Sequence, residues 1–198
     1  MTPVVLASKS QPRAAILAGA GVAFEVVGSG VDEDQIKHRL AAEGAGPRDV
    51  AGHLAEVKAL AVSAIRPGAI VIGADQTLDL QGKLFDKVDD LDSARERLLA
   101  LRGRAHLLHS AVVVAENGVP LWRVIESPRL QMRAFTDAFL DDYLTQGDGD
   151  LLSSVGCYLL EGQGAQLFER IEGDYFAVLG LPLLPLLAFL RRKGAITT

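Results

Sequence analysis

Residues near the N-terminus could bind a phosphate group. Ser8, Ser10 and Arg13 lie between an apolar run and a segment rich in helix-forming residues. Free N–H groups and the positive end of a helix dipole favour an anion at a helix start, and hydroxyl and guanidinium groups add donors. Pro12 suits the first turn, where its missing N–H needs no partner. An ordinary capped helix after an edge strand is the alternative, because serines are common caps.

Two carboxylates could complete such a site. Asp75 follows the apolar run 69–74, and we expect it at the carboxyl end of that strand, where ligands bind in open α/β sheets. A turn residue that caps nearby N–H groups is the alternative role for Asp75. Glu33 lies in an acidic loop, which could instead serve only to cap the helix that follows.

Two lysines supply candidate cations. Lys58 falls beside the apolar stripe of a predicted helix, although a lysine that only snorkels along the core edge would look the same. Lys87 directly follows a predicted strand. Cations offset the charge of a polyphosphate, and carboxylates can hold a divalent ion or take a proton from the attacking water. We recognise no competing serine–histidine–acid set in the sequence.

The elements that must position these residues alternate between strands and helices, which predicts an α/β fold. Apolar runs predict strands at 4–7, 24–27, 69–74, 105–115, 120–126 and 129–135, and shorter strands at 157–161, 166–171 and 177–179. Helices are predicted at 13–20, 35–43, 49–65, 93–101, 137–143 and 183–190. Asn117 and Gly118 predict a hairpin turn, and 147–150 predicts a polar loop.

Composition limits the class of protein. The 198 residues are 49% hydrophobic and 23% charged, as in a folded domain, and no linker or repeat divides them, so we expect one two-lobed domain over 1–198. The net charge of -5 argues against binding to a nucleic acid polymer. One cysteine, Cys157, fits a reducing compartment, and the longest apolar stretch, 176–190, is too short for a membrane span. We therefore expect a cytoplasmic protein.

Six segments, in the same order, resemble motifs of the Maf family of nucleoside triphosphate pyrophosphatases. They are LASKSQPRAAIL, AEVKA, VIGADQ, LFDKVDD, LRGRAHLLHSAV and SVGCYLLEGQGAQLFERIEGDYFAVLGLPL. The resemblance implies a Maf- and ITPase-like mixed sheet flanked by helices, with a cleft between two lobes, in a homodimer. It also implies hydrolysis of a nucleoside triphosphate to a monophosphate and pyrophosphate, with Mg²⁺, Mn²⁺ or Co²⁺, as house-cleaning of unwanted nucleotides.

The same resemblance assigns roles to individual residues. Asp75 corresponds to the catalytic acid–base residue and, with Glu33, to a metal ligand. The residues that correspond to phosphate ligands are Ser8, Arg13, Lys58 and Lys87, to which we add Ser10. Some cations of the family are missing, so a non-catalytic nucleotide-binding regulator of cell division is the alternative.

Base specificity is predicted to depend on Pro12, Gln76 and Glu161. Gln76 and Glu161 match the branch that is similar to 7-methyl-GTP pyrophosphatases, whereas the dTTP and UTP branch carries Thr and Gln there. A carboxylate can accept both N1–H and N2–H of guanine, while uracil and thymine offer one donor on that edge. Pro12 replaces an Arg in most members and a Trp in the 7-methyl-GTP branch, and Lys9 could supply the missing cation. We expect a tilt toward guanine or 7-methyl-GTP-like substrates.

Overall fold

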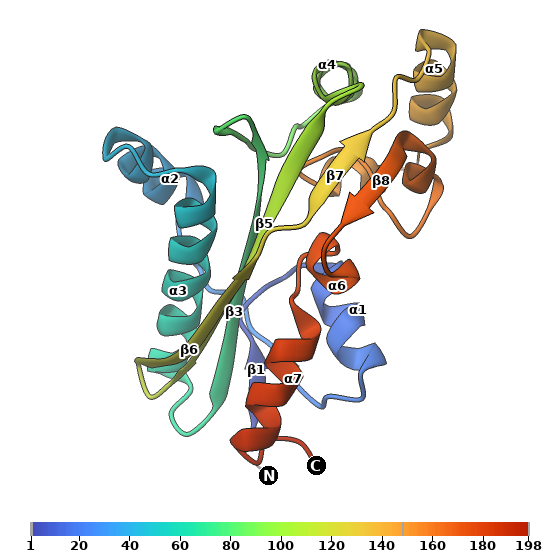
Figure 1. The fold of residues 1–198 in the computed structure, drawn as a ribbon. Helices are drawn as coiled ribbons and strands as arrows, with labels where there is room; N and C mark the ends of the chain where they lie inside the picture. Colours follow the sequence, from blue (N-terminus) through green and yellow to red (C-terminus); the bar gives the residue numbers. More distant parts are fainter. Residues whose placement is uncertain (1, 148, 198) are drawn as a thin grey trace.

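The computed structural model of the protein describes residues 2–147 and 149–197. Within them, an eight-stranded sheet has the order β2-β1-β3-β5-β7-β8, with β4 paired to β3 and β6 paired to β5 (Figure 1). The strands are β1 (Val4–Leu6), β2 (Glu25–Val26), β3 (Ile70–Leu80), β4 (Lys83–Phe85), β5 (Ala105–Glu116), β6 (Val119–Glu126), β7 (Arg129–Met132) and β8 (Phe168–Glu172). β1 is parallel to β2 and β3, whereas the other pairs are antiparallel. The predicted mixed α/β sheet is confirmed.

Helices cover both faces of the long strands β3 and β5. Figure 1 shows α2 and α3 on one side and α1, α6 and α7 on the other. The α-helices are α1 (Gln11–Gly19), α2 (Glu33–Ala42), α3 (Pro47–Ile65), α4 (Leu91–Leu101), α5 (Asp137–Gln146), α6 (Tyr175–Val178) and α7 (Leu183–Arg192). Two 3₁₀ turns, η1 (Gly149–Ser153) and η2 (Gln163–Leu167), connect α5 to β8. No helix of the described residues is long and apolar enough to cross a membrane.

The predicted position of Asp75 at the end of a strand is wrong, because β3 continues through it to Leu80. The backbone after Asp75 pairs with β5 up to Asp79, and its last residues also pair with β4, so the strand has no reason to stop. On the other side of β3, however, the parallel partner β1 ends at Leu6, opposite Ile72. Asp75 therefore lies just beyond the carboxyl end of the parallel pair, although inside its own strand.

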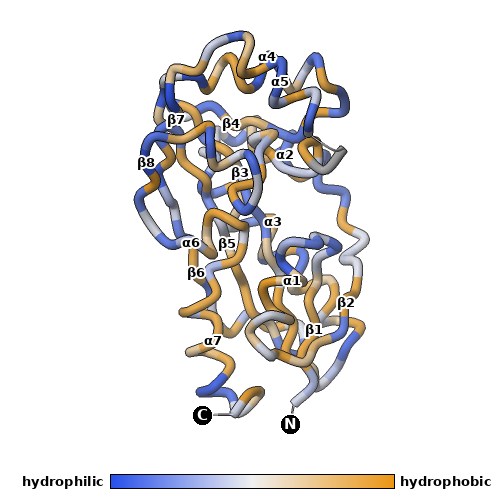
Figure 2. Tube along the Cα trace, turned by 90° about the vertical axis from the view of Figure 1, so that its right-hand side faces the viewer, coloured by the Kyte–Doolittle hydropathy of each residue, from blue (hydrophilic) through white to orange (hydrophobic). Residues whose placement is uncertain are grey.

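Hydrophobic side chains form two large clusters along β3 and β5. One cluster contains Leu17, Ile72 and Ala74 and packs α1 and α7 against the sheet. The other begins at Leu78 and packs α4 and α5 at the opposite end of the molecule, far from the two termini (Figure 2). Asp75 follows the last β3 residue of the first cluster and precedes the first β3 residue of the second.

Several helices begin two residues earlier than predicted. Asp32 caps α2, because its side chain accepts a hydrogen bond from the backbone N–H of Gln35. Glu33 consequently belongs to the first turn of a helix and not to a loop.

The predicted strands at 157–161 and 177–179 are wrong. Cys157 has a left-handed backbone (φ 58°) and starts a turn region, whereas 177–178 belong to α6, which Asp174 caps by accepting from Ala177 N–H. Of the predicted loop at 147–150, Gly147 ends α5, residue 148 lies outside the described residues, and Gly149 begins η1.

Candidate active site

Lys58 joins the two predicted carboxylates at one point. Its Nζ donates to Oδ1 of Asp75 at 2.6 Å and lies 2.8 Å from Oε1 of Glu33. Lys58 is only 5% exposed and Asp75 only 7%. A buried, paired ammonium contradicts the alternative in which Lys58 merely snorkels at the core edge.

A glycine brings Lys58 close enough to make these contacts. A Cβ at Gly73 would lie 2.2 Å from the carbonyl oxygen of Ala55 and 2.5 Å from the backbone N of Ala59. The backbone of α3 therefore lies directly on β3, which only a residue without a side chain permits. Because residues two apart in a strand share a face, Asp75 faces the same helix as Gly73, and there it meets Lys58.

Burial dominates the acidity of Asp75. Desolvation raises the pKa of this carboxyl group, the positive charges of Lys58 and Arg13 oppose the rise, and the negative charge of Glu33 adds to it. The net effect is a pKa above the ordinary value for aspartate. Asp75 can therefore exchange a proton nearer to neutral pH than a surface aspartate, as a general acid–base residue requires.

Arg13 anchors the N-terminal loop to the same place. Its Nη1 donates to Ser8 Oγ and to the carbonyl oxygen of Ala74, both at 3.1 Å, and its Nε donates to Gly180 O at 2.9 Å. Ser8 Oγ also accepts from the backbone N–H of Ser10 at 3.3 Å. Ser10 stands at the N-cap of α1 without a side-chain capping bond. The structure thus brings Ser8 and Arg13 beside Asp75, with Ser10 at the start of the helix.

The charge of Arg13 belongs to this cluster as well. Burial lowers the pKa of its guanidinium group, while the charges of Asp75 and Glu33 raise it. A guanidinium group stays protonated in proteins, so Arg13 supplies a fixed positive charge to the site.

Lys87 faces the cluster from the β4–α4 connection. Its side chain is exposed, yet partial desolvation lowers the pKa of its amine, Arg13 and Lys58 lower it further, and Glu33 and Asp75 raise it. The charges of all four groups of the site therefore affect Lys87. Lys87 is the last of the residues that the sequence predicted to bind phosphate.

Lys37 was missed by sequence reasoning. Its Nζ lies 2.6 Å from Oδ1 of Asp86 and 3.8 Å from Oδ1 of Asp34. Burial alone would lower the pKa of Lys37, but the hydrogen bond and charge of Asp86 outweigh it, and Asp75 and Glu33 raise it further. The available signal was its place four residues after Glu33, one turn along the same helix face.

The predicted base-specificity residues come from three different segments. Gln76 faces the opposite side of β3, where its Nε2 donates to Ser110 Oγ at 2.8 Å and to the carbonyl oxygens of Ala177 and Val178 at 3.1 and 3.0 Å. Glu161 is exposed in the turn before η2, and Pro12 is half-buried in the first turn of α1. The side chain of Lys9 leans over Gly28, in the connection between β2 and α2.

A divalent cation fits the two carboxylates, but an all-protein cage does not. No group of three or more acidic, histidine or cysteine side chains suited to a metal occurs among the described residues. Mg²⁺ is usually held by one or two carboxylates together with waters and substrate phosphates. Glu33 and Asp75 each share one oxygen with Lys58, and a carboxylate has a second oxygen with which to bind a metal.

Contrary to the sequence interpretation, a serine–histidine–acid set is present. His109 Nδ1 lies 2.8 Å from Ser127 Oγ, and its Nε2 lies 3.2 Å from Oδ2 of Asp79. Asp79 also accepts from the backbone N–H of Gly82 at 2.6 Å. The set links β3, β5, the β3–β4 turn and the β6–β7 connection. We interpret it as a structural network.

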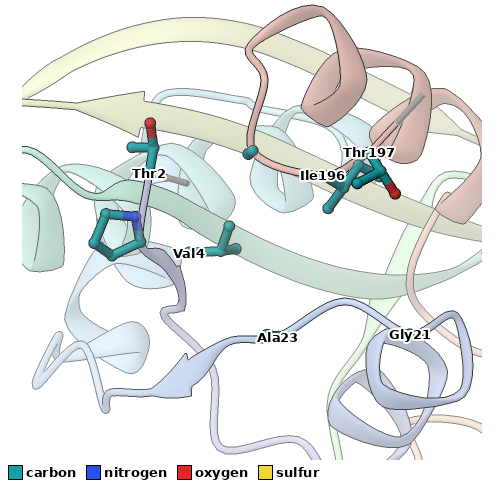
Figure 3. A pocket seen from close by; sticks show the side chains of 8 residues that line it. Thr2, Val4, Gly21, Ala23, Ile196 and Thr197 are labelled. Carbon is teal, nitrogen blue, oxygen red and sulfur yellow. The ribbon is translucent and has the colours of Figure 1, made fainter.

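A cavity of about 350 Å³ lies between the chain termini and is lined by residues that include Thr2, Val4, Ala23 and Ile196 (Figure 3). Its residues precede or begin β1, follow α1 or follow α7. This is the amino end of the parallel strands, opposite to the end where ligands bind in open α/β sheets. The cavity is therefore separate from the charged cluster.

Comparison with known proteins identifies relatives along the whole chain. Residues 3–193 match the family described as Maf-like protein. The chain is 60% identical over 197 residues to a nucleoside triphosphate pyrophosphatase of Caulobacter vibrioides, covering 100% of this chain and 98% of the relative. It is 51% identical to a protein of the same name from Granulibacter bethesdensis, covering 98% of each. A 7-methyl-GTP pyrophosphatase of Brucella abortus is 48% identical, covering 98% of this chain and 97% of the relative.

Proposed function

The chain belongs to the Maf-like protein family, and from this premise we propose that it is a nucleoside triphosphate pyrophosphatase. The reaction splits the bond between the α and β phosphates and yields a nucleoside monophosphate and pyrophosphate. The observation that carries the proposal is the buried Asp75, held by Lys58 beside Glu33 and Arg13. These are the groups that such a hydrolysis needs.

Asp75 acts as the general base in this proposal. Its carboxylate takes a proton from the attacking water, and its raised pKa makes that transfer more favourable than it would be for a surface aspartate. Lys58 fixes the carboxylate through Oδ1 and leaves Oδ2 for the water. The oxygen atoms of Asp75 and Glu33 would hold Mg²⁺, Mn²⁺ or Co²⁺, which when bound would neutralise charge on the phosphates.

The phosphates are bound by positive groups from three segments. Arg13 and the N–H groups at the start of α1 come from one side, together with the hydroxyls of Ser8 and Ser10. Lys58 comes from α3 and Lys87 from the β4–α4 connection. Their charge offsets that of the triphosphate and of the transition state, which is the main contribution proteins make to phosphoryl chemistry.

A tilt toward guanine or 7-methyl-GTP-like bases is the finer part of the proposal. It is supported by the carboxylate of Glu161, which can accept two donors from guanine, and by the name of the Brucella abortus relative. Because Gln76 uses its amide N–H groups on Ser110 and α6, we assign discrimination to Glu161. Gln76 instead fastens α6 to the sheet.

Product analysis tests the function. The protein is incubated with GTP, 7-methyl-GTP, UTP and dTTP in Mg²⁺, Mn²⁺ or Co²⁺, and products are separated by ion-exchange chromatography. Pyrophosphate and monophosphate are expected in equal amounts, and release of orthophosphate would contradict the reaction class. Faster hydrolysis of dTTP than of GTP would contradict the assignment of base discrimination to Glu161. Nucleotide binding without hydrolysis under all three metals would favour the regulator of cell division.

We also propose a setting for the enzyme. The family resemblance supports a single domain over 1–198 with two lobes, a homodimer, and house-cleaning of non-standard nucleotides in the cytoplasm. Analytical ultracentrifugation checks the dimer, for which the expected mass is twice that of the chain. Hydrolysis of a modified nucleotide faster than of the four common ones would support the house-cleaning role.

A further inference from the structure

The loop that carries Lys87 has an ionic attachment to α2. Asp86, the residue immediately before Lys87, accepts a hydrogen bond from Lys37 at 2.6 Å. The Lys37 side chain is 23% exposed and that of Asp86 53% exposed. The attachment joins two segments that are 49 residues apart in the sequence. The residues 86–90 themselves form neither helix nor strand.

Both segments contribute to the charged cluster. α2 places Glu33 against Lys58 in its first turn, and Lys37 lies one turn further along. Strand β4, which ends at Phe85, has three residues and pairs with β3, and α4 begins at Leu91. Between them, Val88 packs against the larger hydrophobic cluster. Lys87 is therefore held on one side by Asp86 and on the other by Val88.

We propose that the Lys37–Asp86 pair is a latch that positions Lys87 for the triphosphate. Lys37 acts through Asp86 and is a positioning residue, whereas Lys87 touches the substrate. The inference rests on the proposed function, because it concerns the binding of the same nucleotide. A latch of this kind determines the Michaelis constant more than the turnover number, since it orders a binding group before the chemical step.

The variants Lys37→Met and Asp86→Asn each remove one charge of the latch. An ion pair of this exposure contributes about 0.2 to 1 kcal/mol, so KM for GTP should rise about 1.4- to fivefold with kcat unchanged. The double variant should be no worse than either single variant, because both remove the same contact. The reversed pair Lys37→Asp with Asp86→Lys should restore KM. A matched control is Arg66→Met, which breaks the exposed 2.8 Å pair with Glu25 and should leave KM unchanged.

A direct phosphate role for Lys37 gives the opposite pattern. Asp86→Asn would then free Lys37 and remove a negative charge, so KM would fall, and the reversed pair would not restore binding. Either result overturns the latch. An unchanged KM in both single variants would do so as well.

Chemical labelling of Lys87 tests the latch without catalysis. Neutral amines react with acetic anhydride, so the pH at which Lys87 is half-labelled, measured by mass spectrometry, follows its pKa. Unlatched Lys87 should move into water and lose its desolvation, which raises its pKa in both single variants. Charge effects alone would shift the two variants in opposite directions, because one loses a cation and the other an anion. Opposite shifts would overturn the latch, even if no nucleotide is hydrolysed and the proposed function fails.

Discussion

Asp75 and Gln76 are neighbours in β3 but face two different environments. On the side of α2 and α3, Asp75 meets Lys58 and Glu33 within a network of full charges. On the side of α6, Gln76 meets the hydroxyl of Ser110 and two backbone carbonyls, which are neutral. Alternation of side chains along a strand therefore separates the two tasks of this segment. One face carries groups that change protonation or bind anions, and the other fastens α6 to the sheet.

The largest expected effect comes from Asp75 on the charged face. Asp75→Asn keeps the shape but cannot accept a proton, so kcat should fall by about 10² to 10⁴. The melting temperature should change little, because the amide oxygen still accepts from Lys58. The control is Asp79→Asn, on the same face four residues further along, which loses the negative charge beside His109 and should keep its turnover. Near-normal turnover of Asp75→Asn would contradict the catalytic role of the charged face, and the contrast between the two faces would be lost.

A variant of Lys58 distinguishes the effect of charge from the effect of burial on the pKa of Asp75. Lys58→Met removes the nearest positive charge, so burial raises the pKa of Asp75 further. The base form is then reached only at higher pH, and the acid limb of the kcat/KM profile should move upward. The matched control is Arg95→Met, which breaks the exposed ion pair with Asp141. A downward shift for Lys58→Met would mean that the limb belongs to another group.

The neutral face should respond to acid through stability instead of activity. His106 lies on the same face of β5 as Ser110, and burial lowers its pKa to about 4. The unfolded chain binds this proton near pH 6.5, so stability is complete above that pH and is lost as pH falls toward 4, by about 3 kcal/mol.

Urea unfolding at several pH values measures this loss. His106→Phe should be less stable at pH 7, because Tyr158 loses its 2.7 Å partner, but its unfolding free energy should depend less on pH in this window. His38→Gln, at an exposed position, is the control. An equal slope in His106→Phe and the wild type would show that another group causes the acid sensitivity.

The smallest effect is expected from Gln76. Gln76→Leu removes the side-chain donor to the carbonyl of Val178, whereas Ala177 O still accepts from Ser110 Oγ. A buried acceptor left unpaired destabilises a protein by about 1 to 3 kcal/mol. Thermal unfolding should show the loss, whereas kcat for GTP should stay close to the wild-type value. A large fall in kcat with unchanged stability would mean that Gln76 contacts the substrate, and the contrast between the two faces would disappear.

The charged residues of the candidate site were easier to select from the sequence than the contacts that position them. Ser8, Arg13, Glu33, Lys58 and Lys87 were selected because residue types and the order of motifs can be read directly from the sequence. Asp75 was identified too, although for a strand end that does not exist. Pairing with β5 extends the strand, and such a partner is 36 residues away in the chain at Ala111.

Contacts between distant segments were out of reach. The Lys37–Asp86 pair and the network of Asp79, His109 and Ser127 depend on which loops meet, and no periodicity encodes that. The apolar residues of α6 were predicted as a strand because a helix of four residues shows no 3.6-residue period. The cap at Asp174 was the only local signal, and a single aspartate before an apolar run is too common to decide.

The contact of α3 with Gly73 makes the reactivity of Asp75 depend on a missing methyl group. Gly73→Ala would place a carbon atom 2.2 Å from the carbonyl of Ala55, so the helix would have to retreat. This movement of α3 would lengthen the Lys58–Asp75 hydrogen bond and leave the buried carboxylate without its partner. Asp75 would then keep its proton. The absence of a Cβ atom at Gly73 would thus determine the acidity of the base. Designers who wish to enlarge the site for bulkier nucleotides should therefore leave the α3–β3 contact intact and widen the loop around Lys87.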